Sequence, residues 1–309
     1  MSGVLHGAGA GALWGLVFLV PALVSDFRPL DLTVGRYLAY GVISAALIAP
    51  RLGRLLPRIG RGEWLGLLWI SFMGNIVYYL LLSAAVQMGG IAMTSLVIGF
   101  LPVAVTIIGS RDKGAVPLRK LAPSLGLCAL GAVCIGWQAV GAPASGSQTK
   151  QLIGLVCAIG ALAAWTIFAV GNRRWLARLD GVSAQDWNLL TGLVTGALAV
   201  VLIPAAVVLP SNPHDGHDWL RLAGTSVGLA VFASIIGNAL WNRMSQLLPL
   251  TLVGQMILFE TLFALIYGFA WERRLPAPLE VAAFAIVVLS VVTCIAAHRK
   301  PAGTERQAG

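Results

Sequence analysis

The sequence predicts an all-α integral membrane protein with ten transmembrane helices, arranged as two inverted repeats of five helices. Three observations support this fold class. The 309-residue chain is 58% hydrophobic and only 11% charged, so it has too few polar groups to cover a soluble globule of this size. Its apolar residues form long runs, and the second half of the chain repeats features of the first. We therefore expect a multi-pass protein of a lipid bilayer.

Ten apolar runs account for most of the chain. A bilayer core about 30 Å thick needs about 20 apolar residues in each crossing helix. We expect helices at residues 5–25, 32–50, 64–87, 90–110, 119–140, 152–174, 184–209, 219–247, 250–271 and 277–297. The connections contain Gly, Pro or charged residues and leave no room for a soluble domain. The first run has no basic residues before it and no A-x-A motif after it, so we expect a spanning helix rather than a cleaved signal.

Lys and Arg are divided unequally between the two sides of the predicted bundle. With the N-terminus inside, fourteen fall on the inner side: Arg51, Arg54, Arg58, Arg61, Arg111, Lys113, Arg119, Lys120, Arg173, Arg174, Arg178, Arg299, Lys300 and Arg306. Five fall outside: Arg28, Lys150, Arg221, Arg273 and Arg274. Because short positive loops stay cytoplasmic, we expect a protein of the inner membrane with both termini in the cytoplasm. Topology also explains the net charge of +9, so we expect no nucleic-acid partner.

The two halves of the chain match weakly when one is shifted against the other. A shift of 159 residues places Gln87 on Gln246, Phe100 on Phe259 and Pro117 on Pro276, and near the start a shift of 151 places Trp14 on Trp165. We expect a first repeat at residues 1–145, a second at 146–300 and a cytoplasmic tail at 301–309. Five helices is an odd number, so the repeats have opposite orientation. Inverted repeats place a substrate site near the midplane between them.

Polar residues recur every four positions in predicted helix 3 and meet polar residues of helix 8 under the same shift. The stripes are Ser71, Asn75, Tyr79, Ser83 and Gln87, and Ser234, Asn238, Asn242 and Gln246. A step of four drifts about 40° per repeat on a helix of 3.6 residues per turn, so only the middle residues of each stripe share a face. We expect the substrate cavity to be lined by Asn75, Tyr79, Ser83, Asn238 and Asn242. The alternative is hydrogen bonding between helices.

Several aromatic residues lie too far inside their helices to anchor at lipid headgroups. They are Trp14, Tyr78, Tyr79, Trp165 and Trp241. A cavity with aromatic walls can bind apolar and aromatic groups by stacking and area burial, and a cation by cation–π attraction. We assign these residues to the substrate site, with packing between helices as the alternative.

Other motifs favour structural roles. The GxxxG pairs Gly11/Gly15 and Gly192/Gly196 permit close helix contact, and we expect packing within a monomer rather than dimerisation. The four Cys residues lie in apolar runs without the spacing of a zinc site or a disulfide framework. His214 and His217 lie in a polar connection that suits a solvated turn. We therefore expect neither a metal nor a cofactor.

Short motifs occur in a fixed order along the chain. They are LWG at 13–15, Arg36 followed by an aromatic residue, FLPVAVTIIG at 100–109, AAW at 163–165 and FETLFALIYGFAWE at 259–272. In this order and spacing the chain resembles the drug/metabolite transporter superfamily, specifically its ten-helix EamA-type members. The resemblance implies the inverted-repeat fold and a transport function. The deep aromatic residues resemble the YddG-like amino acid exporter branch more than the small multidrug-resistance proteins, whose essential Glu in helix 1 is missing here.

Glu260 is a carboxylate inside predicted helix 9. The resemblance implies a Glu-Pro pair at this place, but Thr261 follows Glu260, whereas Pro102 keeps a proline in the first half. We assign Glu260, Pro102 and Gln255 to gating or coupling. Glu260 could carry a proton or act as a structural hydrogen-bonding group. We favour the structural role, because a lone carboxylate has no second titrating group with which to relay a proton.

Together these observations predict a secondary transporter or facilitator that exports small organic metabolites by alternating access. The expected substrates are amino acids, aromatic and other apolar ones, and the expected partners are this solute and the lipid bilayer. An ATP-driven pump would need a GxxxxGKS/T loop, which the sequence lacks. The alternatives are a proton-coupled drug or cation exporter, a channel-forming subunit, and an intramembrane enzyme, which would need a buried set of base, nucleophile or metal ligands. We do not expect an enzyme.

Overall fold

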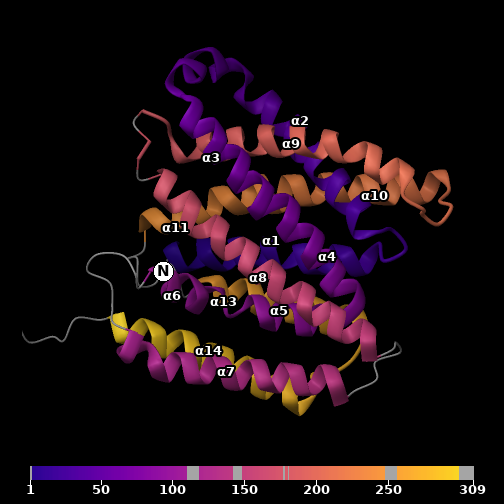
Figure 1. Cartoon of the computed structure of the whole chain (residues 1–309), viewed down its shortest axis with the longest axis vertical. Helices are drawn as coiled ribbons and strands as arrows, with labels where there is room; N and C mark the ends of the chain where they lie inside the picture. The colour runs from indigo at the N-terminus through magenta and orange to yellow at the C-terminus, as the bar shows by residue number, and fades with distance from the viewer. Residues whose placement is uncertain are drawn as a thin grey trace, which may run out of the picture.

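The computed structural model describes residues 2–109, 118–141, 148–176, 178–179, 181–247 and 256–298. Within these ranges the regular elements are all helical, and the long helices run side by side (Figure 1). Six are long and apolar enough to cross a membrane: Gly3–Leu23, Pro29–Arg58, Arg61–Gly89, Gln148–Leu176, Ala184–Val208 and Gly216–Trp241. Shorter apolar helices cover Ile91–Val105 and Pro278–Thr293. The prediction of an all-α, multi-pass membrane protein is confirmed.

The described helices form ten segments, which we number as spans 1 to 10 and which match the ten predicted runs. The first half contains α1 (Ser2–Leu23), α2 (Pro29–Leu55), the combined span of α3 (Arg61–Ser71), η2 (Phe72–Val77) and α4 (Tyr78–Gly89), then α5 (Ile91–Ile98) with α6 (Leu101–Gly109), and α7 (Leu118–Gly141). The second half contains α8 (Gln148–Leu176), α9 (Ala184–Val208), the combined span of α10 (Gly216–Leu229), η3 (Ala230–Gly237) and α11 (Asn238–Leu247), then α13 (Ile257–Glu272) and α14 (Pro278–His298).

The contacts between spans follow a two-fold pattern. Span 1 packs on span 9, and its counterpart, span 6, packs on span 4. Span 1 also packs along span 8, as span 6 does along span 3. Spans 2 and 7 pair with each other, and so do spans 5 and 10, seen as α7 beside α14 at one edge of the bundle (Figure 1). With five spans in each half, these contacts are those of two inverted repeats. The expected repeat boundary at residues 145 and 146 lies outside the described residues.

Each half contains a π-helical segment in its third span. Segment η2 covers Phe72–Val77 and η3 covers Ala230–Gly237, so the shift of 159 residues places the first within the second. A π-helical turn takes up more residues than an α-helical turn and changes the direction of the side chains that follow it. The recurrence at one place of the repeat supports the inverted-repeat interpretation.

Glycines allow close packing of helices within the chain. A Cβ on Gly11 would lie 2.8 Å from the backbone nitrogen of Glu260, so α1 and α13 touch through their backbones here. In the same way, a Cβ on Gly196 would lie 2.6 Å from the Cα of Gly41, where α9 crosses α2. Both predicted GxxxG pairs therefore face helices of the same chain.

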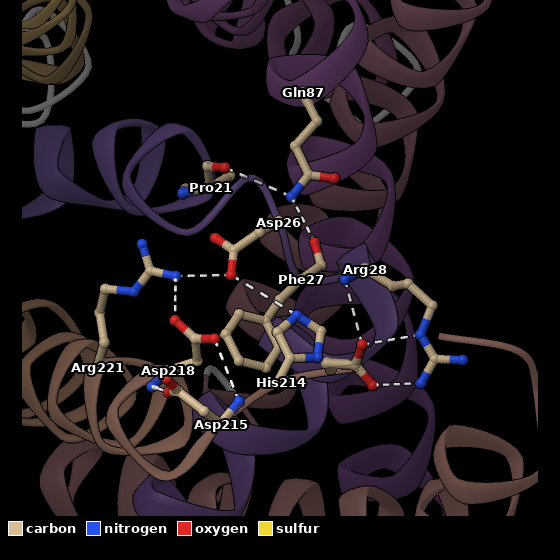
Figure 2. Close-up of polar contacts among 10 residues, drawn as sticks. Pro21, Asp26, Phe27, Arg28, Gln87, His214, Asp215, Asp218 and Arg221 are labelled. Atoms are coloured by element: carbon tan, nitrogen blue, oxygen red, sulfur yellow. Dashed lines mark hydrogen bonds and ion pairs between the residues drawn. The ribbon is translucent and has the colours of Figure 1, made fainter. Parts of the chain in front are cut away.

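At one end of the bundle, side chains join the two halves (Figure 2). Asp26, which follows α1, pairs with Arg221 of α10 at 2.6 Å, and Arg221 also lies 3.2 Å from Asp218. The His214 ring stacks on Phe27 with ring centroids 3.8 Å apart. We call Asp26, Phe27, His214, Asp218 and Arg221 the end network. It shows that the connections of spans 1–2 and 7–8 lie on the same side of the bundle.

The polar connection before α10 differs in part from the expected solvated turn. Asp215 and Asp218 form a capping box, in which the Asp218 backbone N–H donates to Asp215 at 2.8 Å and lowers the pKa of the Asp215 carboxyl. His217 is exposed, as expected. His214 was expected to be solvated, but its side chain is 5% exposed because its ring is covered by Phe27 and Trp219.

Candidate functional site

A cationic side chain lies in the interior of the bundle on span 2. Arg36 is 7% exposed, and its guanidinium carbon lies 4.3 Å from the centre of the Tyr79 ring and 5.2 Å from that of Tyr37. The sequence placed Arg36 close to a helix end, since predicted helix 2 began at residue 32. The helix begins at Pro29 instead, because proline is well tolerated in the first helical turn. Arg36 is therefore about two turns inside the helix.

Several polar atoms around Arg36 are buried without a hydrogen bond of normal geometry to any described residue. They are Nε and Nη1 of Arg36, the hydroxyls of Tyr37 and Tyr79, and Oγ of Ser83. Tyr79 lies beside both Arg36 and Ser83, and Tyr37 packs edge-on against Tyr79 with ring centroids 5.9 Å apart. We call Arg36, Tyr37, Tyr79 and Ser83 the donor cluster. Buried polar groups nearly always have a partner, so such a concentration marks a place where a ligand could supply one.

Glu260 faces the same region from span 9. It lies in the first turn of α13, where the helix dipole favours a negative charge, and it is 7% exposed. Arg36 and Tyr78 lie close enough to interact electrostatically with its carboxylate. Among the described residues, however, no cationic nitrogen comes within ion-pair distance of Glu260. Arg36 and Glu260 thus face one region of the interior without forming an ion pair with each other.

The predicted aromatic residues gather in two groups related by the repeat. Trp14 lies against Trp241, with ring centroids 5.0 Å apart, and Trp165 lies against Tyr78, with centroids 6.3 Å apart. Trp14 also packs on Gly237, which is the counterpart of Tyr78 under the shift of 159. Each deep tryptophan therefore contacts the π-helical region, or the residue that follows it, in the opposite half of the protein.

The amides of the polar stripes bind neighbouring helices. Asn75 donates to the Thr195 hydroxyl at 2.7 Å, and Asn238 donates to the Asn188 side-chain oxygen at 3.0 Å. These are the hydrogen bonds between helices that were the alternative to a substrate role. Asn242 belongs to α11, but its side chain lies outside the described set, as does Gln255. Asn75 and Tyr79 do not share one contact region, because η2 ends between them: Asn75 meets span 7 and Tyr79 meets span 2.

Spans 4 and 9 differ at the position where the sequence departs from the family pattern. Span 4 is interrupted between Ile98 and Leu101, and Pro102, which is partly buried, lies in the first turn of α6. Helix α13 continues through the equivalent point, where Thr261 replaces proline. Thr261 lies against the interruption, since its hydroxyl would be 3.2 Å from a Cβ on Gly99. The assignment of Pro102 to gating or coupling remains a prediction.

Comparison with known proteins identifies the family. A model of the EamA-like transporter family matches residues 1–137. The chain is also 32% identical to the inner membrane protein YtfF of Escherichia coli (strain K12), an alignment that covers 97% of this chain and 96% of that protein. The chain belongs to the EamA-like transporter family. For this EamA-like transporter, a transport function and a location in the inner membrane follow from the family and this relative. The descriptions of the family and of this relative name no enzymatic activity.

A solved crystal structure supports the fold of the EamA-like transporter. Its chain superposes with a TM-score of 0.58 at 20% sequence identity, and the superposition covers 97% of this chain and 99% of that one. At this level of identity the likeness concerns the fold alone. It extends over both halves, including the second half, which the family model does not reach.

The sequence left two groups of interior residues out of the predicted site. Arg36 and Tyr37 lie at the centre of the donor cluster, and Asn188 and Thr195 of span 7 bind the amides of Asn238 and Asn75. A signal for Arg36 was present, because an ionisable residue inside an apolar run is a functional candidate by default. The span 7 residues gave no comparable signal, since Asn188 and Thr195 are uncharged and belong to neither polar stripe.

Proposed function

We propose that this EamA-like transporter exports amino acids with aromatic or other apolar side chains. The observation that carries the proposal is the gathering of aromatic rings beside a guanidinium and a carboxyl group: the buried Tyr37, Tyr78 and Tyr79 from the first half and the half-buried Trp165 from the second, next to Arg36 and Glu260. An amino acid presents an apolar side chain and two opposite charges. Aromatic walls bind the first by stacking and burial, and charged groups orient the second.

Alternating access would act between the two repeats, 1–145 and 146–300. The end network joins them on the side where the connections of spans 1–2 and 7–8 meet. On the opposite side, Arg51 pairs with Asp186 at 2.8 Å and Arg58 donates to the Gly181 carbonyl at 2.6 Å. Opening one set of contacts while the other holds would expose the centre to one compartment at a time. We propose that the termini are cytoplasmic and that the protein works as a monomer.

A solute screen in proteoliposomes tests this function. Vesicles containing purified protein are loaded with phenylalanine, leucine, aspartate or lysine, and the release of each is compared with that from empty vesicles. We expect release of phenylalanine and leucine, and little release of the charged amino acids. Saturable release of unrelated solutes, with none of phenylalanine or leucine, would overturn the proposal.

A proton-coupled exporter of drugs or organic cations is the second candidate. One observation favours it: Glu260 is a buried carboxylate without an ion-pair partner among the described residues, as expected for a site that binds cations or protons. Release of a lipophilic cation such as ethidium, driven by an imposed pH gradient and absent for phenylalanine, would select this function over amino acid export.

A further inference from the structure

We infer that the donor cluster of Arg36, Tyr37, Tyr79 and Ser83 is the subsite that binds the carboxylate of the transported solute. The inference rests on the proposed function in assuming an organic solute that enters the centre of the bundle. It goes beyond that function by naming the group that the protein recognises and the side chains that bind it.

Arg36 brings a positive charge into the interior of the bundle. A guanidinium does not lose its proton in proteins, so this buried side chain carries a positive charge. The rings of Tyr37 and Tyr79 attract that charge. A ring face is only a weak hydrogen-bond acceptor, however, and Nε and Nη1 make no hydrogen bond of normal geometry to a described residue, although the Tyr79 hydroxyl lies close to the guanidinium. The charge is thus partly stabilised while its N–H donors remain available to an anion.

Hydroxyl groups near Arg36 offer further hydrogen-bond donors. The hydroxyls of Tyr79 and Ser83 are buried and also make no hydrogen bond of normal geometry. They lie one helical turn apart on α4, and Tyr79 is the residue whose ring contacts Arg36. Hydroxyls and a guanidinium can all donate to one acceptor. An anion with two oxygens could accept from several of these donors at once, and hydrogen bonds to a charged acceptor are stronger than those to a neutral one.

The charge of the site suits a carboxylate better than a more highly charged anion. Arg36 supplies one positive charge, and the Glu260 carboxylate faces the same region. A phosphate dianion would therefore keep one negative charge that Arg36 does not balance. A carboxylate carries a single negative charge, and its planar geometry suits the planar guanidinium. The rings beside Arg36 would then contact the apolar part of the same solute.

The test uses four probes that share a phenyl group and differ in their charged groups. Phenylalanine and 3-phenylpropionate carry a carboxylate, whereas phenylalanine amide and phenethylamine do not. Binding to purified full-length protein is measured by calorimetry at constant pH. We expect both carboxylate probes to bind the parent more tightly than the two probes without a carboxylate. Equal affinities across the four, or no binding of either carboxylate probe at millimolar concentration, would overturn the inference.

Variants of Arg36 connect the preference to this site. Arg36→Gln should weaken binding of the carboxylate probes about ten- to a hundredfold, the range for a lost hydrogen bond to a charged group, and leave the other probes unchanged. Arg36→Lys keeps the charge but not the planar fork, so its loss should be smaller. Arg54→Gln, an exposed change on the same helix, is the matched control. Unchanged carboxylate binding in both Arg36 variants would contradict the inference.

Folding and transport are followed in parallel. Size-exclusion profiles and thermal unfolding confirm that each variant is folded; if Arg36→Gln is not, Arg36→Lys and the four-probe series in the parent decide. Phenylalanine release separates this inference from the proposed function. Arg36-dependent binding of 3-phenylpropionate without phenylalanine release would support the subsite and reject amino acid export. Phenylalanine release, together with the same affinity for the carboxylate probes in the parent and the Arg36 variants, would support amino acid export and reject the subsite.

Discussion

The indole nitrogen of Trp14 donates a 3.0 Å hydrogen bond to the carbonyl oxygen of Ala233, which lies inside the π-helical segment η3. A π-helical turn changes which backbone groups pair with each other, so a carbonyl there can accept from outside its own helix. This bond joins span 1 of the first half to span 8 of the second. Trp14 is thereby a structural residue of the interface between repeats, whether or not it also contacts the solute.

Replacing Trp14 by Phe should destabilise the protein by about 1 kcal/mol more than the same change at Trp165, because both changes shorten the ring but only the first loses a donor, the one to Ala233. Trp165→Phe is the matched control, since the contacts of Trp165 are with the rings of Tyr78 and Phe168. Denaturant unfolding in detergent micelles measures both. Equal losses in the two variants would show that ring size, and not the hydrogen bond, matters at Trp14.

The aromatic residues on the other side of the centre should contribute to affinity. Trp165→Ala removes a ring beside Tyr78, and we expect about 1 kcal/mol weaker solute binding, or roughly fivefold. Trp69→Ala removes a ring from span 3 that is 52% exposed on the outside of the bundle, so it should leave affinity unchanged. Binding titrations of the best solute from the screen compare the two variants. Parent affinity in Trp165→Ala would assign that residue to packing alone.

Topology can be read with single cysteines in a variant whose four natural cysteines are replaced. Arg61→Cys lies at the start of α3 and His217→Cys lies in the first turn of α10, and both positions are exposed. The uneven distribution of Lys and Arg places the first in the cytoplasm and the second outside. An impermeant thiol reagent should therefore label His217→Cys in intact cells and Arg61→Cys only after lysis. The reverse pattern would invert the assigned orientation.

Glu260 has two possible roles that its variants separate. If it acts structurally, Glu260→Gln should keep most transport, because an amide still donates and accepts hydrogen bonds, while Glu260→Leu should lose it. Solute flux in proteoliposomes is measured with and without an imposed pH gradient for the parent and both variants. A parent flux driven by the gradient, together with an uncoupled flux in Glu260→Gln, would show instead that Glu260 carries the proton.

Much of the fold could be predicted because the bilayer imposes it. A helix that crosses the hydrocarbon core needs a minimum apolar length, and all ten apolar runs marked in the sequence are found as helical spans in the described residues. The π-helical segments η2 and η3 were not predicted. Their sequences are apolar like their neighbours, and nothing in residue type distinguishes a π-helical turn from an α-helical one.

The site was predicted less well, for two physical reasons. The spacing argument that put Asn75 and Tyr79 on one face assumed a regular helix, and η2 breaks that regularity between them. Arg36 was expected near a helix end, but its helix begins three residues earlier than its apolar run, at Pro29, which places Arg36 in the interior. In contrast, the approach of Trp165 to Tyr78 could be anticipated, since both are aromatic and lie far inside their helices.

The end network has a consequence for the medium around the protein. The side chains of Asp26, Asp218 and Arg221 are 30 to 38% exposed, so dissolved ions reach them. Such ions screen charges over about 8 Å at physiological ionic strength and less at higher salt. On the opposite side the Arg51–Asp186 pair is bathed by a different compartment. Each face therefore responds to the salt on its own side. If the two sets of contacts open in turn as proposed, an unequal ionic strength across the membrane should favour opening at the saltier face.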